Sequence, residues 1–239
     1  VNEYTVEAGR PDTFSAEKLQ ILKKHGVRRI SVNPQTTNDT VLKNIGRRHT
    51  AEDFFSAVKL SRENGFDNIN ADIIAGLPGD NFESFVKSID DLLKFDPESI
   101  TLHTLTYKRS SDLFKGDKGS ETFSAAEQVD YAERKLPQMG LNPYYLYRQK
   151  NTVGNLENVG YAKPEFESLY NIYIMEENQN ILACGAGAST KLVNPKTGLI
   201  NRIFNFKYPY EYIARFDEVI SRKEKILEFF RAESMKEQI

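Results

Sequence analysis

The sequence predicts an α/β fold in which parallel strands alternate with helices. Four short segments have the apolar, β-branched composition of strands, and amphipathic segments separate them; the strand segments are residues 4–8, 29–32, 68–75 and 99–105. Their spacing of about 25 to 40 residues is typical of βαβ units with right-handed crossovers. In such sheets the functional site lies at the carboxyl ends of the strands.

Turn and cap residues set the bounds of the first two units. Gly-Arg-Pro at residues 9–11 ends the first strand, because proline cannot donate a backbone hydrogen bond. Ser15 is expected to cap a helix that runs to about Lys24. Asn33-Pro34 stops the second strand. Two further helices are expected before the third strand, one capped by Asn38 and one by Thr50 with Asp53.

The third strand is the most strongly marked segment of the chain. Ile69, Ile73 and Ile74 give it the apolar run of a strand that is covered on both faces. Gly-Leu-Pro-Gly at residues 76–79 ends it, and Asp80 with Glu83 predicts a capping box for the next helix. That helix carries an apolar stripe at helical spacing, which predicts that it packs on the sheet.

After residue 107 the pattern changes, so we expect a domain boundary there, with residues 1–107 in the sheet and 108–239 in a separate C-terminal region. The C-terminal region is expected to hold a helix at residues 124–140, a tyrosine-rich segment at 142–161, a hairpin at 188–206 and a terminal helix from about Tyr210.

Composition excludes several classes of protein. The 239 residues carry a net charge of −2, which gives no broad nucleic-acid footprint. No apolar run reaches the length that a membrane span requires, and the cytoplasm is the expected compartment. The chain has a single cysteine, Cys184, and three scattered histidines, so a metal site with several thiolate or imidazole ligands is not expected within it.

Asp72 is the first candidate for function. A carboxylate inside a predicted buried strand is costly unless a partner or a ligand interacts with it, and the sequence suggests no partner. By contrast, His103 in the middle of the fourth strand is interpreted as a core histidine, and Cys184 as a small buried hydrophobic residue.

Motifs at the four strand ends and beyond resemble those of the radical S-adenosylmethionine (SAM) superfamily. The first four are VEAGRP at residues 6–11, SVNPQ at 31–35, IGRRH at 45–49 and NADIIAGLP at 70–78. Three more are YRQKN at 147–151, GNLENVGY at 154–161 and GAGAS at 185–189. Within the superfamily, this ordered set is similar to the oxygen-independent coproporphyrinogen III dehydrogenase family over nearly the whole chain.

The resemblance implies a partial parallel (βα) barrel that lacks its first two βα units and carries an α+β C-terminal extension. It also implies a set of SAM-binding residues, which are Glu7, Gln35, Arg47, Asp72 and Thr106. Carboxylates suit ribose hydroxyls or an ammonium group, and Arg47 suits the carboxylate of the cofactor, although the register leaves Arg48 open. Tyr147 and Arg148 are expected to contact the substrate, while the other tyrosines face either a tetrapyrrole or the inner lining of the barrel.

One departure from the family pattern concerns its [4Fe–4S] cluster. The CxxxCxxC motif whose thiolates bind that cluster is absent, and the resemblance places it upstream of Val1. The sequence is therefore interpreted as a fragment that is inactive alone. The parent enzyme is expected to cleave SAM reductively and to decarboxylate propionate side chains oxidatively in heme biosynthesis, with an electron donor as partner.

Two alternatives stay open. Relatives in the superfamily carry heme rather than oxidise a porphyrinogen, and those relatives keep a histidine in the tract that corresponds to residues 155–161. This chain has none there, which favours the enzyme. The other alternative is a metal-free barrel enzyme with a phosphate site at residues 185–189.

Overall fold

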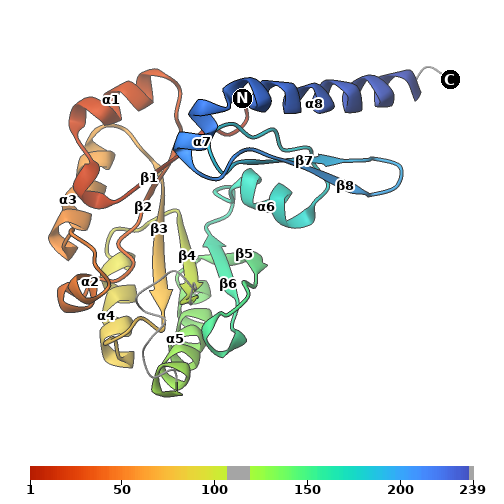
Figure 1. The fold of residues 1–239 in the computed structure, drawn as a ribbon. Coiled ribbons are helices and arrows are strands. Elements are labelled where there is room, and N and C mark those ends of the chain that lie inside the picture. The colour runs from red at the N-terminus through yellow and green to blue at the C-terminus, as the bar shows by residue number, and fades with distance from the viewer. Residues whose placement is uncertain (107–118, 237–239) are drawn as a thin grey trace. The chain divides into compact units, whose positions relative to one another are not determined.

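The computed structural model describes residues 1–106 and 119–236. It confirms a mixed α/β fold with a parallel sheet, and it divides the chain into two compact units, Val1–Leu169 and Tyr170 onward (Figure 1). The boundary expected between residues 107 and 108 lies outside the described residues and stays a prediction. Two strands that follow it in the sequence nevertheless belong to the sheet of the first unit.

The first unit is built on a six-stranded sheet with the order β1-β2-β3-β4-β6-β5. The strands are β1 (Thr5–Gly9), β2 (Arg29–Val32), β3 (Asn68–Ala75), β4 (Ser99–Thr104), β5 (Asn142–Tyr147) and β6 (Asn158–Ala162). The first four pair in parallel, as the sequence predicts, whereas β6 runs antiparallel to both β4 and β5. The tyrosine-rich segment thus extends the sheet.

Helices connect the parallel strands. They are α1 (Ala16–Lys24), α2 (Asp39–Asn44), α3 (Ala51–Glu63) and α4 (Phe82–Leu93), and α5 (Gly119–Gln138) follows β4. Short 3-10 turns occupy Pro11–Thr13 and Val153–Asn155. The predicted caps Ser15, Asn38 and Thr50 all accept backbone hydrogen bonds. The prediction for α4 is wrong by one residue, because Asn81 rather than Asp80 caps it.

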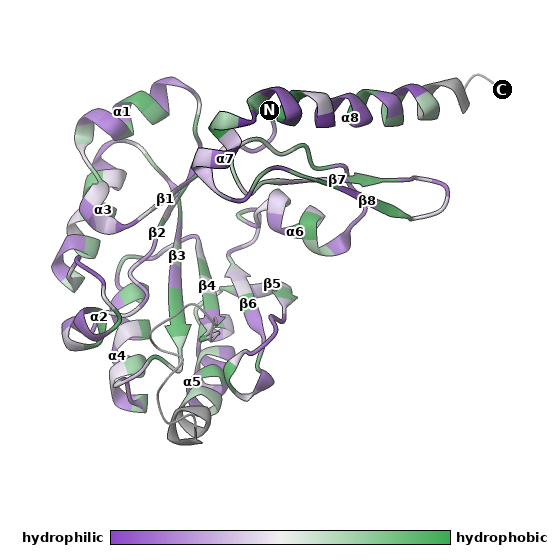
Figure 2. Ribbon diagram, viewed as in Figure 1, coloured by the Kyte–Doolittle hydropathy of each residue, from purple (hydrophilic) through white to green (hydrophobic). Residues whose placement is uncertain are grey.

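The hydrophobic core lies between the helices and one face of the sheet. Alternate strand residues such as Ile30, Ile73 and Leu102 are fully buried there beside Phe54 of α3 and Ile89 of α4. Figure 2 shows the hydrophobic colouring of β3 within this layer. Because successive strand residues point to opposite faces, the residues between these apolar positions form the other face of the sheet.

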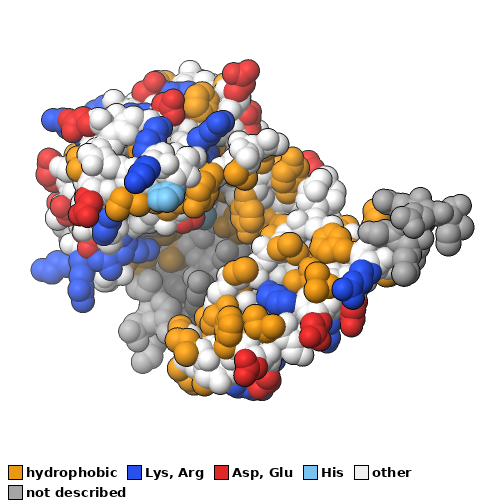
Figure 3. All heavy atoms as spheres, turned by 90° about the horizontal axis from the view of Figure 1, so that it is seen from above, with side chains coloured by type: hydrophobic (Ala, Val, Ile, Leu, Met, Phe, Trp, Pro, Cys, Tyr) orange, Lys and Arg blue, Asp and Glu red, His pale blue; other side chains and the backbone are white. Residues whose placement is uncertain are grey.

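The second unit contains a β-hairpin and three helices. The predicted hairpin is confirmed as β7 (Ser189–Val193) paired with β8 (Ile200–Phe204). The helices are α6 (Leu169–Glu176), α7 (Pro209–Ala214) and α8 (Phe216–Lys236). Several large hydrophobic residues of α7 and α8 are exposed, among them Ile213, Ile220 and Leu227, and Figure 3 shows such side chains between charged ones. No helix in the described part of the chain could span a membrane.

Candidate functional site

The face of the sheet opposite the core is polar. Polar residues on neighbouring strands lie level with one another, since Ser31 pairs with Asn70 and Asn70 with Ser99, while Asp72 pairs with Thr101. We call this surface the polar face; its residues are Glu7, Ser31, Asn70, Asp72, Ser99, Thr101, His103, Tyr145, Tyr147 and Gly160.

Asn70 is the centre of a hydrogen-bond network on the polar face. Its Nδ2 donates to Ser31 Oγ at 3.0 Å and to Asp72 Oδ1 at 2.8 Å. Its Oδ1 accepts from Ser99 Oγ at 3.0 Å and from Thr101 Oγ1 at 3.2 Å. All four hydrogen-bonding positions of the amide are used, so strands β2, β3 and β4 are joined through one side chain.

Asp72 is held on both carboxylate oxygens. Asn70 binds Oδ1, and His103 Nε2 lies 3.5 Å from Oδ2. The side chain of Asp72 is 18% exposed and that of His103 is 27% exposed, so the pair is partly open to solvent. The sequence suggested no partner for Asp72, and the structure supplies one in His103, the expected core histidine, whose two ring nitrogens lie near Asp72 and Tyr147.

Glu7 joins the site from β1. Its side chain remains open to solvent, but surrounding protein atoms and, second, the charge of Asp72 raise the pKa of its carboxyl group. Hydrogen bonds from Ser31 and Asn33 and the charge of Arg29 act in the opposite direction. Glu7 and Asp72 are thus two carboxylates from different strands of the polar face whose charges interact, an arrangement that suits a cation or hydroxyl donors.

Gln35 lies beside Asp72 through its backbone. Its amide nitrogen donates to the Asp72 carbonyl at 3.0 Å, and its own carbonyl accepts from the Ile74 amide at 2.9 Å. Gln35 is buried and has a φ of 68°, which is uncommon for a residue other than glycine. The preceding residue is also fixed, since buried His49 donates from Nε2 to the Pro34 carbonyl at 3.1 Å.

The other predicted SAM ligands are placed differently. Arg47 is exposed in the turn after α2, and among the described residues no hydrogen bond or ion pair joins its guanidinium to Glu7 or Asp72. Thr106 follows β4, and its Oγ1 lies 3.3 Å from Thr152 Oγ1. The structure therefore brings Glu7, Gln35 and Asp72 together and places Arg47 and Thr106 on adjoining loops.

The two predicted substrate contacts also differ from each other. The Tyr147 hydroxyl lies 3.4 Å from His103 Nδ1, on the polar face. Burial and, second, the charge of Asp72 raise the pKa of the Tyr147 phenol. Arg148 is exposed and forms an ion pair with Glu157 at 2.7 Å.

Tyr145 and Tyr147 of β5, which we call the tyrosine edge, lie at the border of the polar face, and Tyr145 reaches over the neighbouring strand β6. A Cβ atom added to Gly160 would lie 1.8 Å from Tyr145 Cε1, so the ring packs directly over the backbone of β6. The Tyr145 and Tyr147 rings are almost parallel, with an interplanar angle of 4° and centroids 6.2 Å apart. The two rings are stacked on one another, and the Tyr147 hydroxyl lies next to His103.

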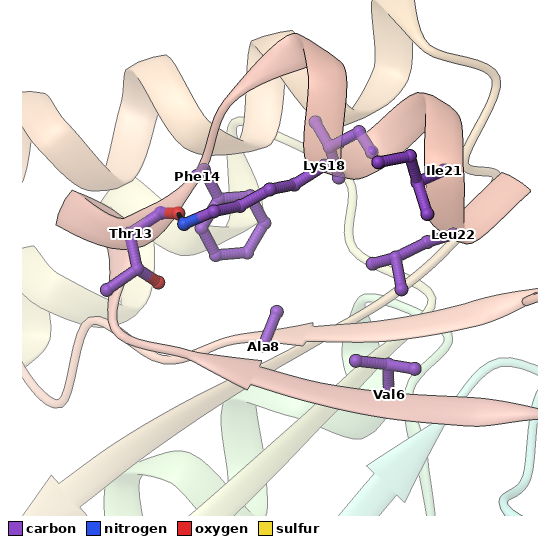
Figure 4. Close-up of a pocket in the computed structure, with 8 residues that line it drawn as sticks. Val6, Ala8, Thr13, Phe14, Lys18, Ile21 and Leu22 are labelled. Carbon is purple, nitrogen blue, oxygen red and sulfur yellow. Dashed lines mark hydrogen bonds between the residues drawn. The ribbon is translucent and has the colours of Figure 1, made fainter.

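A separate pocket in the first unit is apolar. It has a volume of about 290 Å³ and lies between β1 and α1, where Val6 and Ala8 face Ile21 and Leu22 (Figure 4). The one charged residue in its lining is Lys18, which donates to the Thr13 carbonyl at 2.8 Å. Because a nucleoside site requires several convergent polar groups, the polar face fits such a ligand better.

The residues present do not fit a [4Fe–4S] cluster. Cys184 is the one cysteine of the sequence, and it is exposed rather than buried, which corrects the interpretation of it as a buried hydrophobic residue. Within the described ranges no three histidine, cysteine or acidic side chains could hold a metal ion together. One thiol cannot supply the three thiolates of a CxxxCxxC motif.

Comparison with known proteins gives the family. The family model described as "Radical SAM superfamily" matches residues 2–92. The chain is 45% identical over 231 residues to the oxygen-independent coproporphyrinogen-III oxidase-like protein HemZ of Bacillus subtilis, a match that covers 95% of this chain and 46% of HemZ. The chain therefore carries a radical SAM domain.

Two further similarities place this radical SAM chain among its relatives. It is 32% identical to the heme chaperone HemW of Bacillus subtilis, over 88% of this chain and 55% of HemW. The solved structure of coproporphyrinogen III oxidase (HemN) from Escherichia coli has the same fold, with a TM-score of 0.67 at 19% identity over 90% of this chain and 49% of HemN. The chain spans about half the length of these proteins.

Proposed function

We propose that the polar face binds SAM and that the protein acts in oxidative decarboxylation of the propionate side chains of coproporphyrinogen III. The observation that carries the proposal is that Glu7 and Asp72 lie on one partly exposed polar face, close enough for their charges to interact, with Gln35 bonded to the Asp72 backbone. Similarity to HemZ supports the choice of reaction, since HemZ is described as oxygen-independent coproporphyrinogen-III oxidase-like.

The side chains of Glu7, Gln35 and Asp72 suit the parts of SAM. Glu7 and Asp72 accept hydrogen bonds from ribose hydroxyls or the ammonium group, and Gln35 supplies an amide that both donates and accepts. Arg47 would hold the carboxylate of the cofactor from the neighbouring turn, and Thr106 would line the site after β4. Arg47 is free to do so because its side chain is exposed.

The tyrosine edge suits a flat tetrapyrrole. Tyr145 and Tyr147 offer parallel rings, and Arg148 offers a guanidinium for a propionate. The ion pair between Arg148 and Glu157 is exposed, with both side chains at least 40% accessible, so exchanging Glu157 for a substrate carboxylate costs little.

The redox step requires groups that this chain does not hold. When it is bound at a reduced [4Fe–4S] cluster, SAM supplies the hydrogen abstraction that starts propionate oxidation. The thiolates for that cluster are not in the sequence, so the catalytic proposal concerns a protein that also carries them, an electron donor and, as we propose, a cytoplasmic location. In this proposal the residues of this chain bind and orient the cofactor.

Isothermal titration with SAM tests the binding proposal on this chain. Glu7→Gln and Asp72→Asn keep the shape of each side chain but remove its charge, and each is expected to weaken binding about tenfold or more, as expected for lost charge-assisted hydrogen bonds. Asp130→Asn, an exposed acid of α5, is the matched control and should bind like the wild type. Equal affinity in all four proteins would refute the site.

Heme binding is the second candidate function, because the chain is also 32% identical to a heme chaperone. Residues 155–161 contain no histidine that could serve as an axial ligand there. Titration with heme and with coproporphyrin distinguishes the two functions. A Soret band from stoichiometric heme binding, with no binding of coproporphyrin, would favour heme trafficking over decarboxylation.

A further inference from the structure

His103 is the imidazole of the polar face. Its imidazole is packed between three strands. Nε2 lies 3.5 Å from Asp72 Oδ2 of β3, and Nδ1 lies 3.4 Å from the Tyr147 hydroxyl of β5. From β6, Asn158 hydrogen-bonds to the ring, and Asn158 is itself fixed because its Oδ1 accepts from the Thr104 amide at 2.9 Å. The ring therefore has a defined orientation toward Asp72.

Resting on the proposed SAM site, we infer that His103 is a positioning residue that fixes the Asp72 carboxylate and sets the net charge that the cofactor meets. Asn70 holds Oδ1 and His103 holds Oδ2, so the carboxylate is oriented from two strands. With the imidazole protonated, Glu7, Asp72 and His103 together carry one negative charge. With the imidazole neutral, they carry two.

The charged and titratable groups around His103 favour its protonated form. Burial disfavours the imidazolium, but the hydrogen bond and charge of Asp72, the hydrogen bond to Asn158 and the charge of Glu7 outweigh it, so the pKa of His103 is raised. The other titratable neighbours are the phenols of Tyr145 and Tyr147, which are neutral at physiological pH because burial raises the pKa of both.

The sign of the pH effect follows from charge. SAM carries two positive groups, a sulfonium and an ammonium, and one carboxylate, so it is a net cation. A bound cation disfavours the protonated imidazole of His103. Binding should lower the pKa of His103, and affinity should rise with pH as the imidazole loses its proton. If SAM binding lowers the pKa of His103 by about one unit, the affinity for SAM should rise about tenfold as the pH passes through the pKa values of the bound and free protein. The pKa of His103 in the free protein lies above the ordinary histidine value of about 6.5.

Titration calorimetry with SAM between about pH 6 and pH 9 tests this coupling on the full chain. The wild type should bind more tightly as pH rises. His103→Gln, which keeps a donor toward Asp72 but never carries a charge, should lose the imidazole's contribution and therefore show a different, flatter dependence of affinity on pH than the wild type in this window. His103→Leu removes the donor as well and should bind more weakly at every pH. His25→Gln, which alters an exposed histidine after α1, is the matched control and should keep the wild-type profile.

The imidazole can also be observed directly, independently of SAM. The chain has three histidines, so proton NMR titration with His103→Gln as the assignment standard resolves each one. The pKa of His103 should fall when Asp72→Asn removes the carboxylate charge.

The outcomes separate this inference from the proposed function. Binding of SAM with the same pH profile in His103→Gln and the wild type would overturn the inference and leave the SAM site in place. A His103 pKa that Asp72→Asn does not change would also overturn it. Failure of the wild type to bind SAM at any pH would overturn the proposed function, and the inference with it.

Discussion

At the scale of single residues, Gly160 and Tyr145 show how closely the polar face is packed. The Tyr145 ring occupies the space that any side chain at position 160 would require. Thr101, Gly160 and Tyr145 lie at one level of the sheet, so the glycine lets an aromatic ring reach the middle of the site. A side chain here would move the ring rather than strain the backbone of β6.

Gly160→Ala should therefore destabilise the protein by about 1 to 3 kcal/mol through overpacking. Urea unfolding monitored by circular dichroism measures the change. In the double variant Gly160→Ala/Tyr145→Leu the smaller side chain leaves room for the methyl group, so the cost of the alanine should fall by at least half. An equal cost in both backgrounds would show that the ring does not occupy this space.

Glu7 illustrates a residue whose position favours binding over stability. Because the pKa of its carboxyl group is raised in the folded protein, its ionisation opposes folding above that pKa, and the cost is absent below the unfolded value of about 4.3. Glu7→Gln should stabilise the protein at pH 7 by a few tenths of a kcal/mol to about 1 kcal/mol, a range reduced for solvent screening. Urea midpoints at pH 7 and pH 4 measure the gain, which should disappear at the lower pH.

Glu98 is the contrasting carboxylate. It is buried, accepts from the Ile69 amide at 2.9 Å and lies 2.9 Å from Arg62 Nη1. Glu98→Gln should lower the urea midpoint, because it leaves a cation without its partner. A gain in stability from Glu98→Gln, or a loss from Glu7→Gln, would contradict the distinction between a binding carboxylate and a structural one.

Among single residues, the sequence points most clearly to a charged side chain at a position that is predicted to be buried. Asp72 was identified because a carboxylate in an apolar strand requires a partner or ligand. Its partner His103 was missed, although the alternation of Ser99, Thr101 and His103 with apolar residues already indicated a polar face. The pairing itself depends on the register between β3 and β4, which single-strand patterns do not contain.

At the scale of elements, α4 is fastened to the loop that carries Gln35. Ser88 Oγ accepts from the Thr37 amide at 3.0 Å, and Asp91 Oδ2 accepts from Thr37 Oγ1 at 2.9 Å. Asp91 is buried and also bonds to Lys87 and Lys94. Burial would raise the pKa of Asp91, but these three hydrogen bonds together lower it.

Asp91→Asn should cost about 1 to 3 kcal/mol of stability at pH 7, as expected for a buried charged hydrogen-bond acceptor. A lowered folded pKa means that this stability is present above the unfolded value of about 3.9 and is lost as pH falls through the folded pKa. The difference in urea midpoint between the wild type and Asp91→Asn should be smaller at pH 3 than at pH 7. Asp90→Asn, the neighbouring exposed acid, should change stability by no more than about 0.5 kcal/mol at either pH.

Cap and turn chemistry predicted most elements of the parallel part. Ser15, Asn38 and Thr50 mark helix starts because their side chains satisfy free backbone amides. The same logic was wrong at Asp80, whose neighbour Asn81 offers an equivalent oxygen one residue later. The sequence does not distinguish two adjacent residues that can both cap a helix, because the choice between them depends on how the helix packs.

At the scale of the whole molecule, the tyrosine-rich segment shows what sequence periodicity leaves open. Strands β5 and β6 continue the sheet in the antiparallel sense, and they bring Tyr145, Tyr147 and Asn158 to the polar face. The sequence marks residues 142–161 only as a tyrosine-rich segment and carries no signal of which strand they join. That choice depends on long-range pairing with β4.

The chain by itself should not bind an iron–sulfur cluster. A [4Fe–4S] centre requires several thiolates, and Cys184 is the one cysteine. After anaerobic reconstitution with iron and sulfide, followed by gel filtration, iron per chain should remain far below four atoms. Cys184→Ser should give the same result as the wild type. Stoichiometric cluster uptake by either protein would contradict this account of the cofactor.

The central claim is that the ends of β1, β2 and β3 converge on one site for SAM. Hydrogen–deuterium exchange with and without SAM tests it most directly, because slow exchange of backbone amides reports ligand contact segment by segment. We predict protection in peptides that cover residues 5–10, 33–37 and 70–79 together, and its loss in Asp72→Asn. Protection confined to residues 170–236, or no change in any of the three segments while SAM is bound, would contradict the claim.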